Sequence, residues 1–60
     1  MDKLDEPKFL SAKTVSEILD VSETSAYRII KKLNKELESQ GKITIPGKIS
    51  KRYFDEKTYL

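Results

Sequence analysis

The spacing of apolar residues predicts two helices in the first two-thirds of the chain. Val15, Ile18 and Leu19 lie at i, i+3 and i+4, so they fall on one face of a short helix. A second helix is predicted over residues 23–40. Its apolar series has the same helical spacing and consists of Ala26, Ile29, Ile30, Leu33 and Leu37.

Short polar residues and glycine mark the predicted ends of these helices. Ser11 and Ser22 are each placed to cap a helix N-terminus with the side-chain oxygen. Asp20 tolerates the left-handed backbone conformation, so it can end the first helix in a tight turn. Gly41 is expected directly after the second helix. The helices are therefore expected to be joined by a turn of only three residues, 20–22.

From residue 43 to residue 50 apolar and polar residues alternate around Pro46-Gly47, a pattern that predicts a small β-hairpin. Pro-Gly favours a type II turn, whereas tight hairpins favour types I′ and II′, so we expect an irregular loop. Ser50 can cap a last helix that runs to about Lys57. The residues expected in the core from this part of the chain are Ile43, Ile45, Ile49 and Phe54. The predicted fold is mostly α, three helices with a small β-hairpin.

Length and composition restrict the function classes. A chain of 60 residues allows one domain, which we expect over residues 9–60 after a flexible, charged segment 1–8. Cysteine and histidine are both absent, so the sequence predicts no metal site, no cofactor and no enzyme activity. There is no apolar run of membrane-spanning length and no secretory signal, so we expect a cytoplasmic protein without membrane contact.

The charge is unevenly distributed along the chain. Residues 1–23 hold three Lys against six Asp or Glu, a balance of −3. Residues 24–60 hold nine Lys or Arg against four Asp or Glu, a balance of +5. This asymmetry suits a protein that presents one side to a polyanion, although a solvated lysine-rich surface gives the same numbers.

A helix-turn-helix motif needs apolar residues on its first helix, a small residue at the helix crossing and an unusual backbone in the turn. Val15, Ser16 and Asp20 meet these needs, with Val21 expected to fill the gap between the helices. The stretch FLSAKTVSEILDVSETSAYRII, followed by the hairpin and by ISKRYFDEK, resembles the excisionase-type proteins of phages and bacterial mobile elements. These proteins belong with the MerR-like winged helices. Most such families have glycine where this chain has Asp20.

The resemblance implies a winged helix-turn-helix that binds double-stranded DNA in a sequence-specific manner. Helix 23–40 would enter the major groove and hairpin 43–50 would be the wing. The protein would act as an excisionase-like architectural factor or as a transcriptional regulator. Further copies bound cooperatively, and a recombinase or a repressor, are the expected protein partners.

The candidate DNA-binding residues lie mainly on the solvent side of helix 23–40. Arg28 is the first choice for a base contact, because guanidinium can bind guanine O6 and N7 together. Hydroxyl groups near the helix start can reach bases or phosphates, whereas lysines are expected on phosphates. The full set is Ser22, Thr24, Ser25, Tyr27, Arg28, Lys31, Lys32, Lys35, Lys48, Lys51 and Arg52.

Each candidate also has a structural interpretation. Lys32 can pair with Glu36, and Lys35 with Glu38, along the helix. Tyr27 can pack under the wing, and the lysines of the hairpin can simply protect its edge from aggregation. The alternative function is a protein-interaction module in which the same helix binds a repressor or host protein. For that role Ile30, Leu33 and Leu37 would form a short seam with a partner helix.

Overall fold

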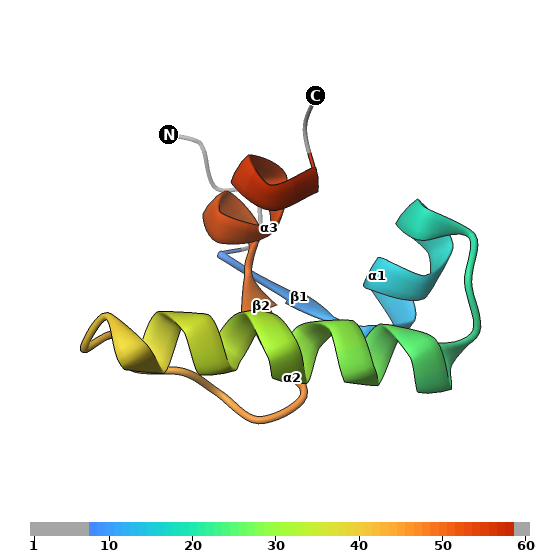
Figure 1. Cartoon of the computed structure of the whole chain (residues 1–60). Helices are drawn as coiled ribbons and strands as arrows, with labels where there is room; N and C mark the ends of the chain where they lie inside the picture. The colour runs from blue at the N-terminus through green and yellow to red at the C-terminus, as the bar shows by residue number, and fades with distance from the viewer. Residues whose placement is uncertain (1–7, 59–60) are drawn as a thin grey trace.

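The computed structural model describes residues 8–58, which form three helices and two short strands (Figure 1). In chain order the elements are β1 (Phe9–Ser11), α1 (Ala12–Leu19), α2 (Glu23–Ser39), β2 (Lys48–Ser50) and α3 (Lys51–Thr58). The predicted flexible segment 1–8 lies outside the described residues except for Lys8, so the domain boundary stays a prediction. Within residues 8–58 no helix is both long and apolar enough to cross a membrane.

Both predicted caps at the ends of α1 are confirmed. The Ser11 side chain accepts a hydrogen bond from the Thr14 amide at 3.3 Å. Asp20 follows the helix with φ 58° and ψ 49°, the left-handed conformation that the sequence predicted. The turn is closed by the Val21 amide, which donates to the Ser16 carbonyl at 3.0 Å. Val21 itself remains 38% exposed, so it fills the gap between the helices only in part.

The ends of α2 are also set by local sequence. The Ser22 hydroxyl accepts a hydrogen bond from the Ser25 amide at 3.1 Å. At the other end Gly41 has φ 83°, where a residue without Cβ is unstrained. Two amides then satisfy the last carbonyls: Gly41 donates to Glu38 at 2.9 Å and Lys42 to Leu37 at 3.0 Å. This paired arrangement is a Schellman motif.

The core is built mainly from the apolar side of α2. Fully or almost fully buried are Leu10, Ala12, Val15, Ala26, Ile30, Leu33, Leu37, Ile49 and Phe54. The helical series predicted for α2 is thus confirmed, with Ile29 partly buried at its edge. Ile30, Leu33 and Leu37, which the alternative function required on the surface to contact a partner helix, are buried in the core of the chain.

The strand pairing differs from the predicted hairpin 43–50. β2 pairs antiparallel with β1, with Phe9 opposite Ser50 and Ser11 opposite Lys48. Residues 42–45 form no strand. The reason lies in the turn, where the Lys48 amide donates to the Ile45 carbonyl at 3.0 Å and Gly47 has φ 77°. That is the predicted type II geometry, and a type II turn splays the segments on either side of it. Residues 42–45 therefore do not pair with β2, which pairs with β1 instead.

The altered pairing changes which isoleucines are buried. Ile49 and Phe54 are in the core as predicted. The prediction was wrong for Ile43, which is 93% exposed, and for Ile45, which is 39% exposed. Both lie on the loop of residues 42–47, which we call the wing loop. The fold remains mostly α with a two-stranded antiparallel sheet, a winged helix-turn-helix as predicted.

Candidate nucleic-acid interface

The side of α2 that faces away from the core carries a continuous polar and basic surface. Thr24, Arg28, Lys31 and Lys35 follow one another at i, i+4, i+7 and i+11, so they lie along one line of the helix. Lys32 lies beside them, and all five side chains are exposed. We call these five residues the basic face of α2. Because it opposes the buried series, the basic face can contact a partner without any change to the core.

The first turn of α2 adds hydroxyl groups to this surface. Ser22 is exposed and Ser25 half-buried, and their hydroxyls are joined at 3.1 Å. The Ser22 oxygen already caps the Ser25 amide. Other amides of the first turn of a helix lack helical partners, and the helix dipole favours an anion there. The N-terminal end of α2 can therefore accept a phosphate as well as present its side chains.

The wing loop runs along one side of α2, whereas α3 lies on the other side (Figure 1). Three residues of α2, namely Asn34, Glu38 and Tyr27, contact this loop or the residue that follows it. The Asn34 amide group donates to the Ile45 carbonyl at 3.2 Å and to the Lys48 carbonyl at 2.9 Å. The Thr44 hydroxyl donates to the Glu38 carboxylate at 2.6 Å. The third contact is between Tyr27 and the turn.

Tyr27 lies beside the turn of the wing loop. A Cβ placed on Gly47 would be 3.5 Å from Cε1 of the Tyr27 ring, an ordinary van der Waals distance, so the turn lies close to the ring. The ring is nevertheless 55% exposed. Tyr27 thus contacts the wing loop, as its structural interpretation predicted, and keeps enough free surface to contact a ligand.

An open groove separates α2 from the wing loop. Tyr27, Lys31 and Lys35 form one wall of the groove, and Pro46 and Gly47 belong to the other. Lys31 and Lys35 outnumber Glu38, the one carboxylate among the described residues that line this groove, so its charge favours an anion. The groove, the basic face and the start of α2 are all formed by α2 and the wing loop, and together they make one polar, cation-rich surface.

Comparison with known proteins decides the family. The model of the Mga helix-turn-helix domain matches residues 1–55. The chain belongs to the Mga helix-turn-helix domain family. A relative from Bacillus subtilis (strain 168), the ICEBs1 excisionase, is 37% identical over 49 residues, which cover 82% of this chain and 77% of the relative. No solved structure matches. The match and the relative confirm the resemblance found in the sequence, that of an excisionase-type helix-turn-helix DNA-binding protein.

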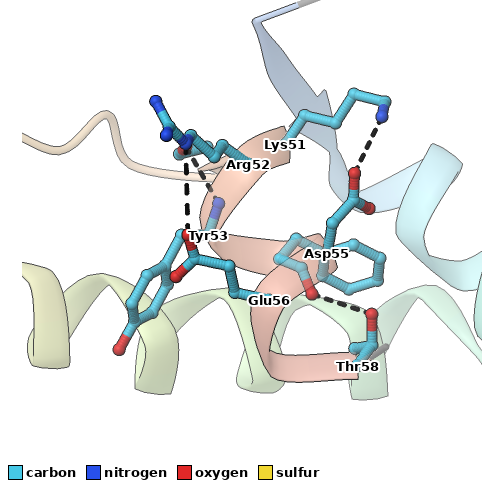
Figure 2. Close-up of polar contacts among 8 residues, drawn as sticks. Lys51, Arg52, Tyr53, Asp55, Glu56 and Thr58 are labelled. Atoms are coloured by element: carbon cyan, nitrogen blue, oxygen red, sulfur yellow. Dashed lines mark hydrogen bonds and ion pairs between the residues drawn. The ribbon is translucent and has the colours of Figure 1, made fainter. Parts of the chain in front are cut away.

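Not all candidate residues of this helix-turn-helix protein lie together. Lys48 is exposed at the first position of β2, just after the turn of the wing loop and not at a hairpin tip. Lys51 and Arg52 lie on α3, on the opposite side of α2 from the wing loop (Figure 1). There the Lys51 ammonium is 2.8 Å from Asp55 and the Arg52 Nε is 4.0 Å from Glu56 (Figure 2). Lys51 is thus paired with a carboxylate of its own helix, whereas the Arg52 side chain is 93% exposed and lies only near one.

The acidic partners predicted for two lysines of the basic face are engaged elsewhere. Glu36 accepts a hydrogen bond from the Tyr53 hydroxyl at 2.7 Å and lies 3.5 Å from the Lys57 ammonium. Glu38 accepts from Thr44 of the wing loop. The two carboxylates therefore hold α3 and the wing loop against α2. Lys32 and Lys35 remain exposed on the helix-turn-helix surface.

The contacts around Glu36 also shift its titration. The hydrogen bond from Tyr53 lowers the pKa of the Glu36 carboxyl, desolvation opposes this, and the charge of Lys57 adds to the lowering. The same hydrogen bond raises the pKa of Tyr53. The carboxylate charge raises the pKa of Lys57, whose ammonium is also 5.5 Å from the centre of the Tyr53 ring. The cluster joins α2 to α3 and keeps the carboxylate ionised.

Sequence reasoning missed Asn34. It is the polar residue at the edge of the apolar series, four positions after Ile30, and it is only 8% exposed. A neutral amide at such a position signals a buried polar group that needs hydrogen-bond partners. The sequence could not identify those partners, which are the carbonyls of Ile45 in the wing loop and of Lys48 at the start of β2.

Proposed function

We propose that this excisionase-type protein binds double-stranded DNA in a sequence-specific manner, with α2 in the major groove and the wing loop beside it. The observation that carries the proposal is the basic face of α2, which is exposed from Thr24 to Lys35 and lies opposite the core. A major groove about 12 Å wide admits a helix of this kind.

Within this arrangement Arg28 reads a base. Its exposed guanidinium stands in the N-terminal half of α2, the part that meets base edges in helix-turn-helix complexes. Thr24, Ser25 and Tyr27 lie near enough to reach neighbouring bases or phosphates. The lysines of the basic face bind phosphates, which fix the position of the protein without selecting a sequence.

One DNA strand would pass over the groove between α2 and the wing loop. Lys31 and Lys35 would neutralise its phosphates from one wall, and Lys48 would meet the flanking backbone or the minor groove from the end of the wing loop. Lys51 would have to leave Asp55 to take part, whereas Arg52 is 93% exposed and free to turn toward DNA; both lie on α3, across α2 from the wing loop. Ser22 contributes through the backbone at the start of α2.

The biological role proposed is that of an architectural factor in excision, favoured by the name of the Bacillus relative. Several copies would bind side by side and assist a recombinase. Transcriptional regulation uses the same surface, and DNase footprinting separates the two roles. Several direct repeats near an attachment site support the architectural role, whereas a single site over a promoter contradicts it.

The binding mode is tested by charge-removing substitutions measured against the footprinted site and against unrelated DNA. Arg28→Ala should weaken specific binding by about 1–3 kcal/mol and relax selection at one base pair. Lys31→Ala should weaken binding to all sequences alike and reduce the salt slope by about one unit. Lys13→Ala is the control, because Lys13 is exposed on α1 and is not among the candidate DNA contacts. Equal effects of Arg28→Ala and Lys13→Ala would refute base recognition by Arg28.

A further inference from the structure

Asn34 occupies an unusual place for a polar side chain. It belongs to α2 and is 8% exposed, yet its amide group donates to two carbonyls of another segment. Those carbonyls belong to Ile45 and Lys48, the first and last residues of the Pro46-Gly47 turn. A single side chain therefore holds both ends of this turn.

The chemistry of the two acceptors fixes what residue 34 must be. Both partners are carbonyl oxygens, so both need a donor, and an NH2 group supplies two. A carboxylate of the same size would turn an oxygen toward each carbonyl and repel both. An aliphatic residue would leave the carbonyls without these bonds, which is unfavourable for buried polar groups.

Little apolar burial anchors the wing loop to α2. Ile43 is 93% exposed and Ile45 keeps 39% of its surface exposed, so neither isoleucine of the loop is buried in the core. The remaining tether besides Asn34 and the Tyr27 contact is the exposed hydrogen bond from Thr44 to Glu38. The two bonds from Asn34 are part-buried, so they are better shielded from water than the exposed bond of Thr44.

We infer that Asn34 is a positioning residue that sets the distance between the wing loop and α2, so that Lys48 and the basic face reach the same duplex. The inference rests on the proposed function. It assigns Asn34 no contact with DNA, because its donors are used by the wing loop. Asn34 affects DNA affinity by fixing the position of Lys48, the last residue of the turn, whose carbonyl it binds.

A double-mutant cycle tests this pathway. DNA affinity is measured at several salt concentrations for the wild-type protein, Asn34→Asp, Lys48→Ala and the double variant. Lys48→Ala should weaken wild-type binding about tenfold and lower the salt slope by about one unit. In the Asn34→Asp background the same substitution should change affinity less than about twofold and leave the slope unchanged. Arg28→Ala is the matched control and should have the same effect in both backgrounds.

Each other result has a defined meaning. An equal loss from Lys48→Ala in both backgrounds overturns the inference, and so does no loss in the wild-type background. A lack of effect from Arg28→Ala refutes the proposed function instead. Amide hydrogen exchange gives a readout without DNA: the Lys48 amide should exchange faster in Asn34→Asp, while the Ile30 amide in α2 should not.

A second variant avoids the buried site should Asn34→Asp fail to fold. Gly47→Ala strains the turn, because residue 47 has φ 77° and a Cβ is unfavourable there. It leaves the amide of Asn34 in place. The inference requires the effect of Lys48→Ala to shrink in this background too, and an unchanged tenfold loss overturns it.

Discussion

Asp20 offers the sharpest test of the turn between α1 and α2. Within residues 8–58 it is the non-glycine residue with positive φ, at 58° with ψ 49°. Replacement by Gly and by Ala removes the same charge in both variants. The difference between the two variants therefore isolates the effect of a Cβ in the left-handed conformation.

The expected magnitude follows from the backbone angles. An ordinary side chain in the left-handed region costs about 1–2 kcal/mol, and Asp tolerates it better than Ala. Glycine avoids this strain but loses more backbone entropy on folding, by about 0.5–1 kcal/mol. Asp20→Ala should therefore be less stable than Asp20→Gly by about 1 kcal/mol. For a domain of this size that corresponds to a fall of about 8 °C in the unfolding midpoint.

Thermal unfolding followed by far-UV circular dichroism measures the difference. Glu17 provides the control, because it is an exposed residue within α1. There the order should reverse, with Glu17→Ala more stable than Glu17→Gly by about 1 kcal/mol. If Asp20→Ala proved as stable as Asp20→Gly, the left-handed turn would be refuted, and with it the crossing of the two helices.

Two further predictions concern the core and the α2–α3 contact. Ala26→Leu should lower the free energy of unfolding by about 1–3 kcal/mol, because Ala26 is fully buried on the inward side of α2. Chemical denaturation measures this change, and unchanged stability would contradict the inward orientation of α2. The pKa of Glu36 is lowered in the folded state, so the ionised carboxylate stabilises the fold. This contribution to the free energy of unfolding is complete above the ordinary pKa of a glutamate, and it is lost as the pH falls through the folded-state pKa. Glu36→Gln should therefore flatten the loss of stability below about pH 4 relative to the wild type and to Glu17→Gln. Identical acid profiles for all three proteins would show that the contacts of Glu36 contribute nothing.

Local signals in the sequence were sufficient for the helices. Ser11 and Ser22 cap the amides three residues ahead, and Gly41 ends α2 in the left-handed conformation. Each of these contacts spans only a few residues, so composition and spacing determine it. The buried series of α2 is equally local, because the helical period alone decides which residues share a face.

The sheet and the wing loop depend on contacts that no local pattern contains. Phe9 and Leu10 are too few to show strand alternation, yet they complete β1 once α1 and α2 bring them beside β2. The alternation around Ile43 predicted a strand, but the type II turn directs that segment toward α2 instead. The two hydrogen bonds from Asn34 join residues more than ten positions apart in the sequence. These features follow from tertiary geometry, and DNA contact by the candidate residues stays a prediction.

The two opposite sides of α2 have separate tasks. Substitutions at exposed positions typically alter stability by no more than about 0.5 kcal/mol. Thr24 and Arg28 are exposed and can therefore be substituted with little effect on the fold, whereas Ala26 and Ile30 are buried and cannot. Under the proposed function, a change of preferred DNA site would need substitutions only at a few outward positions, at little cost in folding stability.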